Sequence, residues 1–253
     1  MPYVSIDLET TGLDPDRDQI IEVAAVRFDT GGVIERYQSL VNPDRPLEYR
    51  IALLTGIDPA ELEHAPHFST IAREVEQFIA LDPIVGQNPT FDTTFLARAG
   101  LQVFGPTYDT FEIAGLLLPQ LPERSLGAIA EHLGIEFPTR HRAMADAEAA
   151  RLVFLALRER LAASPTDLLA EANRIAAATE WPLRHLLREI AAERPRQPGD
   201  SERPGIVHGF VKAPAGAPDP LEPSTGPVPV PPKQAVELLR SPAAREALTG
   251  FEE

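Results

Sequence analysis

Residues 3–12, YVSIDLETTG, form an apolar strand pattern that carries two acids and ends in a turn. Asp7 and Glu9 stand two residues apart near the end of this strand. Side chains at i and i+2 of a strand point to the same face, so the two carboxylates are predicted to lie side by side. Adjacent carboxylates repel each other unless a cation lies between them. The pair is therefore either a candidate metal site or an ordinary exposed strand face.

The pattern that follows this strand predicts an α/β fold. Residues 20–28 and 33–41 are two further strand candidates, joined by the turn sequence Asp29-Thr30-Gly31-Gly32. Two short segments that end at Val85 and Asp109 predict strands between helical patterns, and residues 143–161 predict a long helix. Strands first and helices interleaved afterwards predict a mixed sheet of about five strands flanked by helices.

The composition changes after the long helix and predicts four parts. A first domain of residues 1–162 is followed by a helical extension, residues 163–194, with helices expected at 167–178 and 182–192. Residues 195–232 contain 11 prolines, which is typical of a flexible linker. Residues 233–253 are expected to hold a short amphipathic helix, about 233–248, and the start of a following domain.

Composition and charge exclude several classes of protein. The chain of 253 residues has 43% hydrophobic and 24% charged residues, as soluble globular proteins do. It contains no cysteine, which excludes disulfides, thiolate zinc sites, iron–sulfur clusters and cysteine nucleophiles. The absence of a long apolar run and of a secretory signal predicts no membrane association and a cytoplasmic location. The net charge of −15 differs from the basic footprint of most nucleic-acid-binding proteins. Acids could nevertheless gather around cations that attract a phosphate.

Three further residues form a candidate catalytic set with Asp7 and Glu9. Asp92 follows a short apolar segment at a predicted helix start, and His141 and Asp146 flank the start of the long helix. Taken singly, each acid is better explained by the preference of carboxylates for helix N-termini, and His141 by an ordinary surface position. Together, four carboxylates and one imidazole are what phosphodiester hydrolysis with two Mg²⁺ ions requires. The carboxylates are oxygen ligands for the cations, and the imidazole is a base that titrates near neutral pH.

These residues resemble the exonuclease motifs of the DnaQ-like DEDDh superfamily. The matching segments are Asp7-Leu8-Glu9-Thr10-Thr11-Gly12, Asn88-x-x-Phe91-Asp92 and His141-x4-Asp146, with Leu54-Thr55-Gly56-Ile57 and Ala65-Pro66-x-Phe68 between them. The resemblance covers about residues 1–162. It implies an RNase H-like fold and 3′→5′ exonuclease activity with two divalent ions, Mg²⁺ or Mn²⁺. By position it implies Asp7, Glu9, Asp92 and Asp146 as metal ligands and His141 as the general base.

The resemblance also implies substrate contacts. Thr10, Thr11 and Leu13 match positions that contact the terminal nucleotide, and Asn88 and Phe91 match positions that line the site. The family commonly has His-Asn where this chain has Gln87-Asn88, so altered substrate contact with intact chemistry is expected.

The arginines near the candidate catalytic residues are too few to predict tight substrate binding. Near His141 lie three arginines that could meet phosphates, Arg140, Arg142 and Arg151. A simpler interpretation of Arg151, Arg158 and Arg160 is that they are solvated helix residues. Without a basic groove, few phosphate contacts and weak, poorly processive binding are expected.

Several later segments resemble the exonuclease domain that is fused to DinG-type helicases: residues 116–119, Ser125-Leu126, the long helix and Trp181-Pro182-Leu183. The terminal Gly250-Phe251-Glu252-Glu253 resembles the segment that leads into the nucleotide-binding part of the helicase. This implies that the chain is the exonuclease portion of a helicase, although no G-x-x-x-x-G-K-[ST] loop for ATP is present. The similar proofreading epsilon subunit of DNA polymerase III is the rival interpretation. The implied partners are single-stranded 3′ ends, preferably of DNA, and either a helicase domain or a polymerase or helicase bound through the C-terminal tail. An RNA-directed exonuclease and a non-catalytic recruitment module stay open as alternatives.

Overall fold

The computed structural model describes residues 1–136 and 142–194. Its strands are β1 (Tyr3–Thr10), β2 (Ile20–Asp29), β3 (Gly32–Leu40), β4 (Ile84–Gly86) and β5 (Thr107–Asp109). Its helices are α1 (Tyr49–Thr55), α2 (Pro59–Glu63), α3 (Phe68–Ile79), α4 (Pro89–Arg98), α5 (Thr110–Leu117), α6 (Leu126–His132), α7 (Ala143–Ala163), α8 (Thr166–Ala176) and α9 (Leu183–Glu193). The predicted linker, the predicted helix at 233–248 and His141 lie outside the described residues.

The strands form one mixed sheet in the order β3-β2-β1-β4-β5. β1 and β2 pair antiparallel, as do β2 and β3, whereas β1, β4 and β5 run parallel to one another. The predicted five-stranded mixed sheet with flanking helices is confirmed. β1, the strand that carries Asp7 and Glu9, is its central strand.

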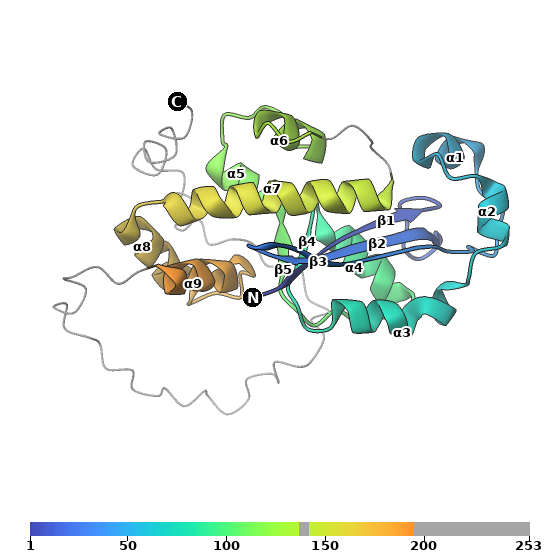
Figure 1. Cartoon of the computed structure of the whole chain (residues 1–253), viewed down its shortest axis with the longest axis horizontal. Helices are drawn as coiled ribbons and strands as arrows, with labels where there is room; N and C mark the ends of the chain where they lie inside the picture. Colours follow the sequence, from blue (N-terminus) through green and yellow to red (C-terminus); the bar gives the residue numbers. More distant parts are fainter. Residues whose placement is uncertain (137–141, 195–253) are drawn as a thin grey trace.

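The alternation along β1 divides the sheet into two covered faces. Val4, Ile6 and Leu8 pack into a core with α3 and α4. The intervening residues face the other way, toward α7, where the Ser5 hydroxyl donates a hydrogen bond to the Ala147 carbonyl oxygen at 2.8 Å. Figure 1 shows α7 lying along one face of the sheet and α3 along the other. Asp7 and Glu9 therefore belong to the α7 face.

Small side chains let α7 approach the sheet closely. Ala143 and Ala147 on the helix pack against Ala24 and Val26 on β2, and all four are buried. Alanine adds no side-chain bulk and favours the helix, so the same residues promote the helix and its tight packing. This contact fixes the N-terminal turn of α7, which carries Asp146, over the strands that carry the other acids.

The helical extension packs into the core of the same body. Trp181 is 1% exposed and shares a hydrophobic cluster with residues of α5, α6 and α7, while its indole N–H donates to Glu112 at 3.0 Å. Arg158, expected to be solvated, is instead 6% exposed. The extension covers this side of α7, so the Arg158 guanidinium bonds to Tyr3, Glu189 and Glu193. No helix among the described residues is long and apolar enough to cross a bilayer.

Candidate active site

The β1 and α7 contact brings three predicted carboxylates together. Each of Asp7, Glu9 and Asp146 offers a carboxylate oxygen that lies within 4.8 Å of the other two. All three side chains are half-buried. Asp146 lies in the first turn of α7 and accepts a hydrogen bond from the Arg142 backbone N–H at 3.2 Å, which holds it at the helix start.

Asp92 approaches the same region from α4. β4 ends at Gly86, and Asn88 adopts a left-handed conformation (φ 57°) that turns the chain into the helix. Asp92 then lies buried in the first helical turn, where its Oδ1 accepts a hydrogen bond from the Leu8 N–H at 2.9 Å. This bond anchors α4 to β1 between the two acids of that strand. Asp92 is not one of the three carboxylates within 4.8 Å of one another.

The four carboxyl groups share one electrostatic environment. Burial, together with the charges of Asp92, Asp146 and Glu9, raises the pKa of Asp7 well above its usual value. Burial and the Asp146 charge raise the pKa of Glu9 to about 7, against the opposing effect of Arg142. Burial raises the pKa of Asp92 to about 8, although the hydrogen bond from Leu8 acts in the opposite direction. The chain thus crowds acids where their negative charge is disfavoured, which is what a cation would relieve.

Glu22 is a fifth acid of this region, and the sequence patterns did not single it out. It stands directly opposite Glu9 on β2 and is 0% exposed. Its carboxylate accepts hydrogen bonds from the Arg142 guanidinium, from the Ala143 N–H at 3.2 Å and from the Gln38 amide at 2.7 Å. The sequence held one signal for this role: Glu22 is the single charged residue in the apolar segment IIEVAAV. A carboxylate that is buried there requires hydrogen-bonding or charged partners.

The arginines near the cluster are already engaged. Arg142, expected to be able to meet phosphates, pairs with Glu22 at 3.1 Å. Arg151 pairs with Glu148 at 2.8 Å on the same helix. These two arginines neutralise Glu22 and Glu148, which are acids of the chain itself. Arg140 and His141 lie outside the described residues.

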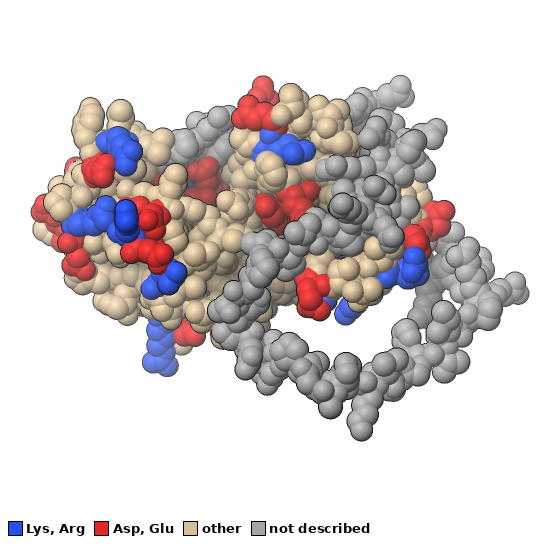
Figure 2. Space-filling view, turned by 180° about the vertical axis from the view of Figure 1, so that it is seen from behind, with Lys and Arg blue, Asp and Glu red and all other residues tan. Residues whose placement is uncertain are grey.

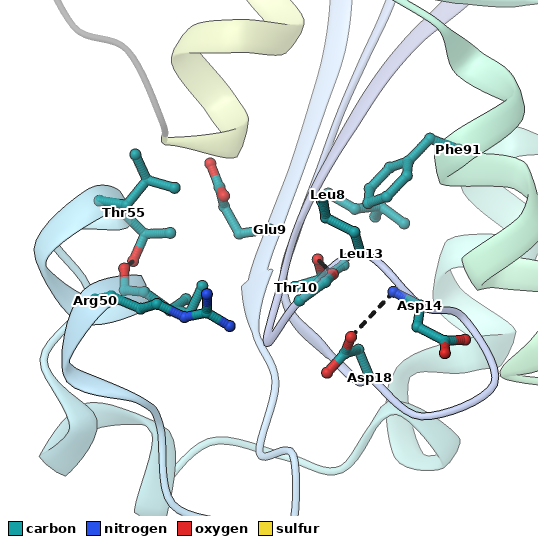
Figure 3. Close-up of a pocket in the computed structure, with 12 residues that line it drawn as sticks. Leu8, Glu9, Thr10, Leu13, Asp14, Asp18, Arg50, Thr55 and Phe91 are labelled. Atoms are coloured by element: carbon teal, nitrogen blue, oxygen red, sulfur yellow. Dashed lines mark hydrogen bonds between the residues drawn. The ribbon is translucent and has the colours of Figure 1, made fainter.

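A pocket of about 770 Å³ adjoins Glu9 (Figure 3). Of the predicted substrate-binding residues, Thr10, Leu13 and Phe91 line it. The opposite wall is α1, which contributes Arg50, Leu54 and two further residues, Ile51 and Thr55. Figure 3 shows β1 and the turn after it on one side of the pocket and α1 on the other. Apolar walls beside a few polar groups are typical of small-molecule sites of this size.

Two predicted substrate-binding residues do not line this pocket. Thr11 is buried, and its hydroxyl donates to Asp18 at 3.1 Å and accepts from the Gln19 N–H at 3.0 Å, so it stabilises the turn between β1 and β2. Asn88 is exposed, and its N–H donates to Asp109 at 2.9 Å.

Gln87, the departure from the family pattern, is engaged inside the protein. Its amide NH₂ donates to the Arg124 carbonyl oxygen at 2.7 Å, and its amide oxygen accepts from the Thr110 hydroxyl at 2.5 Å. The altered substrate contact expected at this position stays a prediction, and in the structure the side chain has a structural role. It ties the end of β4 to α5 and to the segment before α6.

Solved structures that share this fold include Exonuclease I of Escherichia coli. Escherichia coli Exonuclease I in complex with a dA16 oligonucleotide superposes with a TM-score of 0.55 over 62% of this chain and 41% of that chain, at 23% sequence identity. At this identity the likeness shows the fold alone. It defines the described part of the chain as an RNase H-like exonuclease fold.

The sequence comparisons assign the family. The exonuclease (RNase_T) family model matches residues 4–154, and the chain belongs to this family. The chain is 37% identical over 152 residues to the PolC-type DNA polymerase III of Bacillus cereus, a match to 58% of this chain and 11% of that protein. It is 34% identical over 191 residues to the 3′-5′ exonuclease DinG of Bacillus subtilis, a match to 73% of this chain and 20% of that protein. The chain thus matches between about a tenth and a fifth of the length of these relatives, and the resemblance to DnaQ-like exonucleases is confirmed.

Proposed function

We propose that the chain is a metal-dependent 3′→5′ exonuclease that removes nucleoside 5′-monophosphates from single-stranded or frayed DNA ends. The observation that carries the proposal is the convergence of Asp7, Glu9 and Asp146, with Asp92 beside them, next to a pocket lined by Thr10, Leu13 and Phe91. Family membership and the names of the relatives support the same activity.

The residues present fit divalent cations. Mg²⁺ and Mn²⁺ prefer carboxylate oxygens, and carboxylates from β1 and α7 lie close enough to be shared by ions. Burial is the main cause that raises the pKa values of Glu9 and Asp92, and neighbouring carboxylates add to it, so a cation at this site would stabilise their charged forms. Asp7, Glu9, Asp92 and Asp146 would hold two ions. Bound there, such ions would lower the pKa of water and stabilise charge on the reacting phosphate.

The remaining roles belong to side chains around the acids. Leu13 and Phe91 give the terminal nucleotide an apolar surface, and Thr10 supplies a polar group in the same pocket. His141 would accept the proton of the attacking water; this assignment rests on the motif, since the residue precedes α7 outside the described part of the chain. Thr11 and Asn88 would contribute by holding the turns on which the pocket rests.

The wider context is proposed from the relatives. Because DinG and PolC-type polymerase are much longer than the matched region, we place the chain as the exonuclease portion of a DinG-like helicase. A proofreading exonuclease like the epsilon subunit, which meets its polymerase through the C-terminal tail, is the second candidate. The domain boundary at residue 162 and the linker at 195–232 stay predictions in both cases.

The test is release of mononucleotides from a 3′-labelled oligodeoxynucleotide with Mg²⁺ or Mn²⁺. Activity that requires the metal and disappears in Asp7→Ala supports the proposal, and equal activity in Asp7→Ala or in EDTA contradicts it. A matched RNA oligonucleotide distinguishes an RNA-directed enzyme, because 2′-OH contacts would then favour RNA. Absence of cleavage together with tight binding to a protein partner would identify a recruitment module instead.

A further inference from the structure

We propose that Arg50 binds a backbone phosphate of the substrate strand and is the cation that attracts the strand to this acidic chain. The inference rests on the proposed exonuclease function and adds a substrate-binding residue to it. Arg50 is one of the lining residues of the pocket beside Glu9. Figure 3 shows its side chain extending from α1 toward the pocket.

The position of Arg50 follows from the helix that carries it. Arg50 and Leu54 are four residues apart on α1, so they lie on one face of the helix, and both line the pocket. Leu54 therefore offers the substrate an apolar contact one turn away from a positive charge. This combination suits a nucleic-acid strand, in which an apolar base lies close to the phosphate of a neighbouring nucleotide.

The charge of the pocket lining makes Arg50 distinctive. Among the described residues that line the pocket, Arg50 is the one cation, whereas Glu9, Asp14 and Asp18 are acids. Asp14 and Asp18 pair with Arg17 and Arg45, neither of which lines the pocket. A polyanion that enters this pocket meets the positive charge of Arg50.

The arginines elsewhere are mostly bound to acids of the chain itself. On the face shown in Figure 2, acidic and basic groups lie side by side. Arg27, Arg36, Arg98 and Arg184 are examples of described arginines that form ion pairs. Such pairing reduces the attraction that these described arginines exert on phosphates, so a cation at the pocket itself contributes to binding.

The contact that holds Arg50 in the free protein is weak enough to be exchanged. Its Nε donates to Glu48 at 2.8 Å, and the two side chains are 75% and 53% exposed. Exposed ion pairs stabilise proteins little. The contact with Glu48 uses one of the five N–H groups of the guanidinium, and the planar guanidinium suits phosphate oxygens well. A phosphate could therefore join or replace Glu48 at small cost.

The experiment compares Arg50→Ala, Arg50→Lys and Arg50→Glu with the control Arg174→Ala. Arg174 also forms an exposed pair with a nearby acid, Glu171, but it lies on α8 at the other end of the molecule (Figure 1). Binding of a 5′-labelled oligothymidylate is followed by fluorescence anisotropy in Ca²⁺ at several salt concentrations. Hydrolysis of the p-nitrophenyl ester of thymidine 5′-monophosphate, which has one phosphate, is measured with Mn²⁺. Thermal unfolding verifies that each variant is folded.

The expected result is oligonucleotide binding weakened roughly tenfold in Arg50→Ala, more in Arg50→Glu and less in Arg50→Lys, with Arg174→Ala unchanged. The slope of log affinity against log salt should decrease by about 0.7 in Arg50→Ala, as expected for one lost phosphate contact to a single strand. Hydrolysis of the mononucleotide ester should change little. Equal binding and salt slope in Arg50→Ala and Arg174→Ala would overturn the proposal, as would an equally large loss on the mononucleotide ester. Failure of the wild-type chain to hydrolyse either substrate would refute the proposed function, while the anisotropy data would still decide the role of Arg50.

Discussion

Glu9 and Glu22 stand directly opposite each other on β1 and β2, yet their carboxylates have different surroundings. Glu9 faces Asp7 and Asp146, and its pKa is raised to about 7. Glu22 accepts hydrogen bonds from Arg142, Ala143 and Gln38 and is fully buried. One acid is therefore available to a cation, and its neighbour holds the start of α7 in place.

Replacing Glu22 should loosen the start of α7. In Glu22→Gln one of the two acceptor oxygens becomes a donor, so a buried N–H or guanidinium contact is lost. We expect the free energy of unfolding to fall by about 1–3 kcal/mol in a urea titration. The titration is made near pH 6, where protonation of Glu9 limits its repulsion with Glu22. Glu35→Gln, an exposed acid of β3, is the control, and equal stability of the two variants would contradict this role.

Removing one acid of the cluster should stabilise the metal-free chain. Glu9 and Asp92 bind protons more tightly in the folded chain, with pKa values of about 7 and about 8, than in the unfolded chain, where values near 4 are expected. Stability without metal should therefore fall as the pH rises from about 5 to 8. Asp7→Asn should make this fall smaller, because one of the crowded charges is gone, while abolishing turnover. The free energy of unfolding of both proteins is measured by denaturation in EDTA at about pH 5 and about pH 8. A wild-type stability that rises with pH over this range would argue against charge crowding.

His141→Ala should slow catalysis without changing metal binding. A positioned general base contributes roughly a 10²–10⁴-fold rate increase, so kcat should fall by a factor in this range. Mn²⁺ affinity, measured by calorimetry, should stay at the wild-type value because the four carboxylates are unchanged. His132→Ala, which alters a histidine at the end of α6, is the control. A kcat within a few-fold of wild type would remove His141 from the mechanism.

The helical extension should unfold together with the sheet. Trp181 is buried in the cluster that includes residues of α5, α6 and α7. Trp181→Ala should therefore lower the free energy of unfolding by about 3–5 kcal/mol in a single transition. Tyr49→Ala, which removes an aromatic side chain that is 81% exposed, should have little effect. Two separate transitions would show that residues 163–194 form an independent unit.

Local patterns predicted the parts of the fold and site that depend on neighbouring residues. Alternation placed Asp7 and Glu9 on one face of a strand, and the structure brings a carboxylate oxygen of each close to the other. Glu22 is paired by Arg142, which lies more than 100 residues away in the sequence. Arg158 is buried because α9 packs against it. Such long-range contacts leave no periodic pattern, so the sequence did not reveal them. The resemblance included Leu54 and Thr55 of α1, but the position of this helix across the pocket from β1 was missed for the same reason.

Crystals grown with Mn²⁺ and thymidine 5′-monophosphate give the most direct test of the metal site. Anomalous scattering should locate two ions between Asp7, Glu9, Asp92 and Asp146, with the nucleotide base in the pocket between Leu13 and Leu54. Anomalous peaks elsewhere, or none beside these carboxylates at saturating Mn²⁺, would contradict the proposed mechanism.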